Sequence, residues 1–250
     1  MTLSLSALNL RGILLDIEGT TTPISFVYDV LFPFARARVK NYLAKHWESS
    51  EVGRDSARLR EEHAGDLARN LSPPKLEPEP REAAIDSMAT YVAWLIDHDR
   101  KSTGLKSLQG RVWQEGYRDG TLRSQVFADV PPALECWKRA GLQVSIFSSG
   151  SVLAQQLLFA HSDLGNLTKS IDRYFDTTTG AKTAAQSYRR IANEMQLVCA
   201  EILFISDVVA ELDAAAGAEM QTLLCIRPGN HPQLAGHAHK QIWSFDEIGE

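Results

Sequence analysis

The stretch Gly12-Ile13-Leu14-Leu15-Asp16-Ile17-Glu18-Gly19-Thr20 places two acids directly behind a short apolar run. Residues 12–15 are predicted to form a buried strand, so the acids project past the carboxyl edge of a sheet. Because alternate residues of a strand share a face, Asp16 and Glu18 are expected to point to the same side. One carboxylate can then act as a nucleophile while the other transfers protons, as covalent catalysis requires.

Two more polar side chains follow predicted strands later in the chain. Residues 144–147 form a β-branched and aromatic run that ends at Ser148, and residues 202–205 form an apolar run that leads to Asp207. Helices alternate with these strands, which predicts an α/β fold with a Rossmann-like parallel sheet covered on both faces. Ligands of such sheets bind beyond the carboxyl ends of the strands, so Asp16, Ser148 and Asp207 should converge there.

The other elements of this part of the chain are predicted from caps and periodicity. Asp129 can cap a helix that opens with two prolines and ends at Gly141. The sequence further predicts helices over 151–159, 182–195 and 212–220, and a strand over 222–226.

A long helical insert is predicted between the first strand and the rest of the sheet. Loose periodicity links Phe34, Val39 and Leu43, and a cleaner stripe runs from Tyr91 through Trp94 and Leu95 to His98. Residues 72–80 carry four prolines and must form a loop. The expected division is an α/β core of residues 1–22 and 127–250, with a helical insert of residues 23–126 after the first strand.

Composition narrows the functional classes. Hydrophobic residues make up 44% and charged residues 23%, as in ordinary soluble proteins, and the net charge of −5 argues against nucleic-acid binding. No apolar run is long enough to cross a membrane, and the first ten residues do not read as a signal peptide. Three scattered cysteines without metal spacing favour a reducing, cytoplasmic setting. A monomer is expected.

The polar residues at the strand ends suit phosphoryl transfer. Asp16 and Asp207, with a backbone carbonyl near Glu18, offer the oxygen ligands that Mg²⁺ prefers. Glu211 can brace Lys182 or a water on the metal. Ser148, Ser149 and Gly150 precede a helix and form an anion site, and Lys182 adds positive charge against the phosphate. Glu18 would protonate the leaving oxygen and then deprotonate the attacking water.

Each signal alone also has an ordinary structural explanation. Asp16 and Glu18 can belong to a solvated turn, Ser148 can start a helix cap, and Lys182 can be a surface lysine. Asp207 can be an N-cap, with Glu211 as a first-turn acid. His231, His237 and His239 are more simply explained as a solvated loop than as metal ligands. The four catalytic signals in sequence order at strand ends favour the functional interpretation.

These motifs resemble the haloacid dehalogenase-like phosphatases, and longer stretches resemble their enolase-phosphatase branch. The stretches are Leu14–Thr21, Pro23–Val27, Asp99–Lys101, Leu108–Gly110, Phe127–Val130, Ser148–Ser151 and Arg227–Asn230. Most of the superfamily has aspartate at the position of Glu18. The glutamate in this chain resembles the enolase-phosphatase branch.

The resemblance implies a magnesium-dependent reaction in methionine salvage. The substrate would be 2,3-diketo-5-methylthiopentyl 1-phosphate, which is enolised and then dephosphorylated through an aspartyl-phosphate to the acireductone 1,2-dihydroxy-3-keto-5-methylthiopentene. The helical insert would be a cap that excludes water. From it Lys106, Arg100 and Lys101 could reach the anionic substrate, although Arg100 and Lys101 could equally face solvent. The main alternative is a phosphatase of the same superfamily acting on another small phosphate ester.

Overall fold

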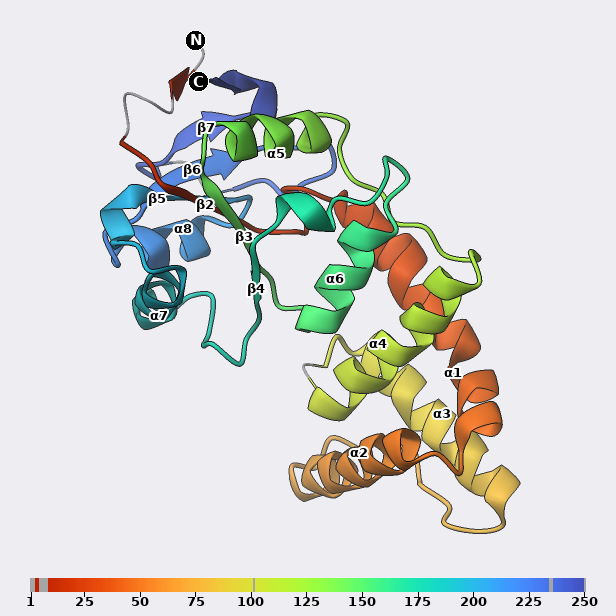
Figure 1. The fold of residues 1–250 in the computed structure, drawn as a ribbon. Coiled ribbons are helices and arrows are strands. Elements are labelled where there is room, and N and C mark those ends of the chain that lie inside the picture. Colours follow the sequence, from red (N-terminus) through yellow and green to blue (C-terminus); the bar gives the residue numbers. More distant parts are fainter. Residues whose placement is uncertain (1–2, 5–8, 101, 234–235, 250) are drawn as a thin grey trace. The chain divides into compact units, whose positions relative to one another are not determined.

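A computed structural model describes residues 3–4, 9–100, 102–233 and 236–249 (Figure 1). The chain divides into two compact units, one formed by Met1–Val27 with Arg123–Glu250 and the other by Tyr28–Leu122. No helix among the described residues is long and apolar enough to cross a membrane. The three cysteines are free thiols.

The first unit is built on a parallel sheet, which confirms the predicted fold class. Its six strands within the described residues have the order β4-β3-β2-β5-β6-β7. Their bounds are β2 Gly12–Leu15, β3 Gln143–Phe147, β4 Arg173–Phe175, β5 Ile202–Ser206, β6 Gln221–Cys225 and β7 Lys240–Ile242. A separate pair joins β1 (Leu3–Ser4) to β8 (Ile248–Gly249). The central strand β2 lies between β3 and β5, with Leu15 opposite both Ile146 and Ile205.

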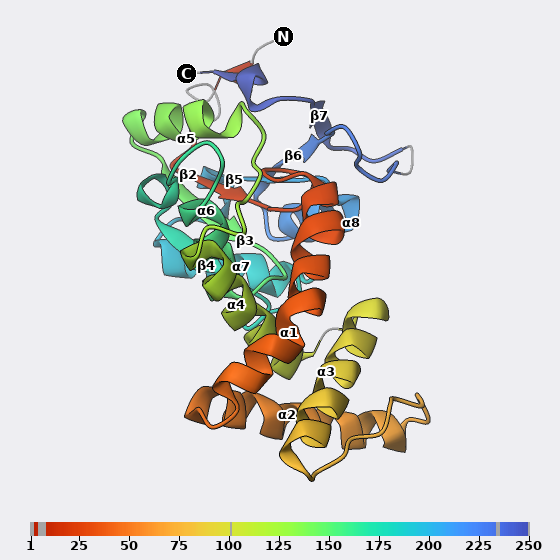
Figure 2. The same ribbon diagram turned by 90° about the vertical axis from the view of Figure 1, so that its right-hand side faces the viewer.

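Helices cover both faces of this sheet. Helix α5 (Val130–Arg139) lies on one face, and α7 (Ala185–Met195) and α8 (Val209–Ala216) lie on the other (Figures 1 and 2). The remaining helix of this unit is α6 (Val152–Ala160), and short 3₁₀ turns cover Thr168–Ser170, Cys199–Glu201 and Phe245–Glu247. Leu14 packs with α7 and α8 in one apolar cluster, while Ile13 and Leu15 are buried as well. Burial of a large aliphatic side chain contributes about 2 kcal/mol, so a strand buried on both faces is firmly fixed.

The helices of the second unit are joined by loops, including residues 69–80, and its described residues contain no strand, as the sequence predicts for the insert. It contains α1 (Phe32–His46), α2 (Ser50–Ala68), α3 (Arg81–Asp97) and α4 (Thr103–Arg118), and a π-helical segment, Phe26–Leu31, precedes α1. Helix α1 packs against α3 and α4, and α2 packs against α4 (Figure 2). The apolar stripe of α1 is Ala35, Val39 and Leu43, with Phe34 only half buried. Assigning this unit as a cap remains a prediction.

Several predicted helix bounds are wrong. Helix α7 begins at Ala185, so Lys182 lies in the preceding turn, and α8 runs from Val209 to Ala216 rather than over 212–220. Helix α5 ends at Arg139, two residues before Gly141. Asp129 stands at its N-cap position but makes no cap hydrogen bond, because its side chain is used elsewhere.

Candidate active site

The predicted site residues of the first unit follow neighbouring parallel strands. Asp16 comes directly after β2, Ser148 after β3 and Asp207 after β5. The amide of Asp16 donates to the carbonyl of Ile205 (3.0 Å), which ties the end of β2 to β5. Because these strands are parallel and adjacent, their carboxyl ends bring the three side chains to one edge of the sheet.

The chain turns sharply after Asp16, contrary to the extended geometry from which Asp16 and Glu18 were expected to share a face. The amides of Thr20, Thr21 and Thr22 all donate to the carbonyl of Ile17, at 3.2, 3.0 and 2.9 Å. These hydrogen bonds satisfy the three amides within the turn itself. Strand alternation therefore does not fix the direction of Glu18.

Lys182 makes the central contact of the site. Its Nζ lies 2.6 Å from Oδ1 of Asp16 and 2.6 Å from Oε2 of Glu211. Burial alone lowers the pKa of Lys182, but the attraction of both carboxylates outweighs this and raises the pKa above its usual value. The hydroxyl of buried Tyr188 donates to the Lys182 carbonyl (2.7 Å) and holds the turn that carries the ammonium group. The predicted pairing of Lys182 with Glu211 is present.

Negative charge is in excess around this lysine. Burial, and then the charges of Asp16 and Glu211, raise the pKa of Asp207 to about 7. Burial and Asp16 likewise raise the pKa of Glu211. Both shifts mean that the carboxylates are desolvated and repel one another, with Lys182 compensating only part of their charge. This is an electrostatic environment in which a divalent cation would be stabilised.

The donor set near Asp207 fits Mg²⁺. Among the described residues, no three His, Cys, Asp or Glu side chains are arranged to hold a metal ion. A cation beside Asp16 and Asp207 would need further oxygens from backbone, phosphate and water. Mg²⁺ binds in this way, with one or two carboxylates and several waters.

The segment after β3 forms a helix start. The Ser148 hydroxyl accepts the Gly150 amide (3.1 Å), and the Ser151 side chain caps α6 by accepting from Ala154 (3.3 Å). Gln155 donates to the carbonyls of Gly150 and Phe175, both at 2.8 Å, and fixes the turn. Ser148, Ser149 and Gly150 thus precede a capped helix, where an anion is favoured.

The predicted substrate contacts of the insert lie in the helical unit. Lys106 is on α4 and is half buried, and Lys101 falls outside the described residues. Arg100 does not point freely to solvent, since its Nη2 lies 2.6 Å from Oδ1 of buried Asp66. These structural facts assign no substrate contact to any of the three.

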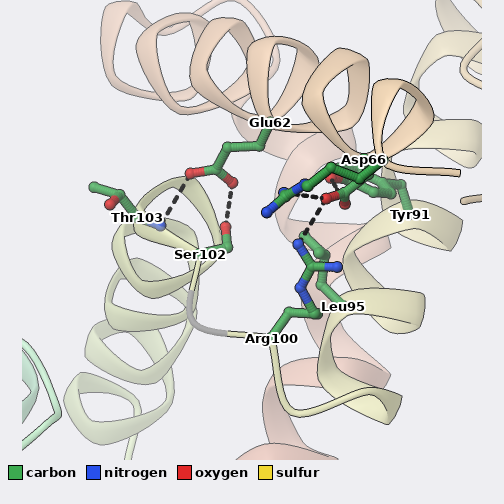
Figure 3. A pocket seen from close by; sticks show the side chains of 8 residues that line it. Glu62, Asp66, Tyr91, Leu95, Arg100, Ser102 and Thr103 are labelled. Carbon is green, nitrogen blue, oxygen red and sulfur yellow. Dashed lines mark hydrogen bonds and ion pairs between the residues drawn. The ribbon is translucent and has the colours of Figure 1, made fainter. Parts of the chain in front are cut away.

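A pocket of about 170 Å³ lies within the helical unit (Figure 3). It is lined by Asp66, which accepts hydrogen bonds from the Tyr91 hydroxyl (2.8 Å), Arg69 (2.8 Å) and Arg100. Glu62 also lines it. Two arginines face two acids, so the formal charges of the lining balance. Asp66 joins α2 to α3 and to the turn after it, and Glu62 joins α2 to the start of α4.

Three contributors to the site were missed from the sequence. The Ser206 hydroxyl lies 3.1 Å from Oε2 of Glu211 and 3.4 Å from Oδ2 of Asp16. Arg227 and Asn230 donate to the backbone of the turn after Asp16. Ser206 could have been found from its place as the last residue of the strand before Asp207. Arg227 and Asn230 could have been found from the stretch Arg227–Asn230, which follows β6 at the same sheet edge.

Comparisons with known proteins define the class. The chain matches the haloacid dehalogenase-like hydrolase family over residues 10–219 and is a member of it. Within that class it belongs to the enolase-phosphatase family. It is 50% identical to "Enolase-phosphatase E1" of Synechococcus elongatus over 242 residues, covering 96% of this chain and 98% of the relative. The protein of the same name from Drosophila melanogaster is 44% identical, covering 88% and 84%.

A solved structure has a similar fold. The crystal structure of the UTR4 protein from Saccharomyces cerevisiae superimposes with a TM-score of 0.76 at 34% identity. The match covers 95% of this chain and 99% of the yeast chain. The resemblance read from the sequence is therefore confirmed.

Proposed function

We propose that this chain is a magnesium-dependent enolase-phosphatase of methionine salvage. It converts 2,3-diketo-5-methylthiopentyl 1-phosphate to the acireductone by enolisation followed by phosphate hydrolysis. The family relationship supports the substrate. The observation that carries the chemistry is the Lys182 ammonium at 2.6 Å from both Asp16 and Glu211, with Asp207 close enough for its pKa to respond to Asp16.

The nucleophile of the proposed reaction is Asp16. Lys182 on Oδ1 and Ser206 near Oδ2 orient its carboxylate. One carboxylate oxygen forms a bond to phosphorus while the bond from phosphorus to the substrate oxygen breaks, which gives an aspartyl-phosphate. Lys182 and the amides at the start of α6 stabilise the charge on the phosphoryl oxygens.

Glu18 is the proposed proton carrier. It protonates the leaving oxygen of the acireductone and then accepts a proton from the water that attacks the aspartyl-phosphate. The base for enolisation is Glu18 or a residue of the helical unit. In the second case the helical unit would act as a cap, with Lys106 contacting the substrate.

Asp16, Asp207 and the Glu18 backbone carbonyl are the proposed magnesium ligands. When bound, Mg²⁺ would offset the repulsion between the Asp16 carboxylate and the phosphate. Glu211 is held by Lys182 and Ser206 and would orient groups around this site. A monomeric, cytoplasmic enzyme remains part of the proposal.

An absorbance assay with the diketone phosphate tests the function. We expect a transient enol signal, then acireductone formation and stoichiometric phosphate release. Phosphate release from generic esters without any enol signal would instead favour a phosphatase for another small phosphate ester.

A further inference from the structure

Arg227-Pro228-Gly229-Asn230 has no part in the proposed chemistry, although it follows β6 at the sheet edge that carries the site. Its two polar side chains both turn back to the backbone after Asp16. Arg227 donates from Nε to the Thr20 carbonyl (3.1 Å), and Asn230 donates from Nδ2 to the Gly19 carbonyl (2.9 Å). These donors satisfy two carbonyls of the turn.

Asn230 is packed tightly against the turn. Gly19 has a positive φ of 69°, and a Cβ on it would lie 2.4 Å from Oδ2 of Asp207 and 2.9 Å from Oδ1 of Asn230. Nδ2 of Asn230 also donates to the Cys225 carbonyl (3.2 Å), so the side chain ties the turn to the end of β6. Gly19 is therefore held between the Asn230 amide and the Asp207 carboxylate.

The Arg227 side chain is also held by contacts outside the turn. Only 6% of the residue is exposed, and its guanidinium lies 4.4 Å from the Phe127 ring centroid and 4.8 Å from that of Phe245. Nη1 pairs with Oδ2 of Asp129 at 2.8 Å. A buried arginine with a carboxylate partner and two ring contacts has little conformational freedom. Its Nε is therefore held in position to donate to the turn.

Asp129 binds Arg227 instead of capping helix α5. An aspartate at an N-cap position ordinarily stabilises its helix by accepting from a backbone amide of the first turn. Here Oδ2 accepts instead from Arg227, the Ser244 hydroxyl and the Phe245 amide (2.6 Å), and α5 has no side-chain cap. The carboxylate is used to hold Arg227 rather than the helix.

We propose that Arg227 and Asn230 are positioning residues for the reaction. They fix the carbonyls of Gly19 and Thr20, and thereby the turn that carries Glu18 and sets Gly19 against Asp207. The inference deepens the proposed function and rests on it for its kinetic consequence. Neither side chain needs to touch the substrate.

Asn230→Ala tests the inference in the full chain. We expect kcat for the diketone phosphate to fall about 10- to 100-fold with KM changed less than about 3-fold, because the turn loses its alignment and not its binding groups. Asn166→Ala is the matched control, since Asn166 is exposed and its side-chain oxygen accepts hydrogen bonds from the amide and hydroxyl of nearby Thr168. Wild-type kcat in Asn230→Ala would overturn the proposal.

Arg227→Lys gives a second, independent variant. Lysine keeps a positive charge that can pair with Asp129, but it lacks the second guanidinium nitrogen that donates to the Thr20 carbonyl. We therefore expect kcat to fall about 10-fold. Arg111→Lys, which alters the pair with Asp55 in the helical unit, controls for a general effect of such a change. Equal losses in the two variants would contradict a positioning role.

Amide hydrogen exchange separates this inference from the assigned activity. In Asn230→Ala, exchange in residues 16–22 should rise about 10-fold or more, while the melting temperature stays within a few degrees of wild type. If the wild-type protein did not turn over the diketone phosphate, the proposed function would be refuted. Amide exchange in residues 16–22 would still test whether Arg227 and Asn230 position the turn. Unchanged exchange in residues 16–22 overturns this inference.

Discussion

At the scale of single residues, Asp16, Asp207 and Glu211 crowd around one ammonium group, that of Lys182. This arrangement is unfavourable for stability, because the buried carboxylates repel one another. It would favour the proposed phosphoryl transfer, because the same charges would hold a cation and present the nucleophile.

Replacing Asp16 by Asn should abolish phosphate release without unfolding the protein. The amide cannot form the aspartyl-phosphate, so turnover should fall by about 10⁴-fold or more. One repelling charge is also removed, so the melting temperature should not drop by more than a few degrees. Phosphate release and thermal melts are compared with Asp163→Asn, the same change at an exposed position. Equal rates in wild type and Asp16→Asn would refute the nucleophile assignment.

Gly19 offers a sharper test with a matched control. Gly19 and Gly141 have similar positive φ values, 69° and 78°, so alanine at either should cost about 1 kcal/mol of backbone strain. A Cβ at Gly141 meets no atom within 4 Å, whereas at Gly19 it collides with the Asp207 carboxylate. We expect Gly19→Ala to lose activity and Gly141→Ala to keep it, as measured by turnover and thermal melts. Full activity in Gly19→Ala would show that the contact is unimportant.

At the scale of elements, strand ends were predictable and the contacts between distant segments were not. Asp16, Ser148 and Asp207 follow apolar runs, so their positions came from local pattern. Ser206 and Tyr188 act through tertiary contacts that no spacing encodes.

The missed strands have a physical explanation as well. Strands β4 and β7 are three residues long, Arg-Tyr-Phe and Lys-Gln-Ile, and lack an apolar run. Their pairing is imposed by the neighbouring strand. The late start predicted for α8 came from reading only its alanine-rich part as helix, although Val209 and Glu211 already belong to it.

Asp66 joins α2 to α3 and should make the helical unit sensitive to acid. Burial opposes its charge, but hydrogen bonds from Tyr91, Arg100 and Arg69 lower its pKa. A lowered folded pKa gives stability above the unfolded pKa of about 4 that is lost as the pH falls. Asp66→Asn should therefore cost about 3 kcal/mol at pH 7 and flatten the fall in stability below about pH 5.

Denaturant unfolding between pH 7 and pH 3 measures this effect. Asp86→Asn is the control, since its pair with Lys40 is exposed and should contribute less than about 1 kcal/mol. An Asp66→Asn variant with the same pH profile as wild type would contradict the role of Asp66.

At the scale of the whole molecule, the proposed function requires a cation, because Lys182 compensates only part of the charge of Asp16, Asp207 and Glu211. EDTA should stop turnover and Mg²⁺ should restore it. Mg²⁺ at about 100 times its Kd should stabilise the folded protein by about 2.7 kcal/mol. Thermal melts of wild type and Asp207→Asn with and without Mg²⁺ check this, and the variant should gain little. Full activity in chelator would remove the metal from the proposal.

The central place of β2 has a consequence for biosynthesis. This strand leaves the ribosome early, but its two partners, β3 and β5, begin only at Gln143 and Ile202. The helical segment Tyr28–Leu122 is complete before either partner exists. During translation Asp16, the proposed nucleophile, therefore remains without the neighbouring strands β3 and β5. A nascent chain that stops short of β5 cannot assemble the proposed site.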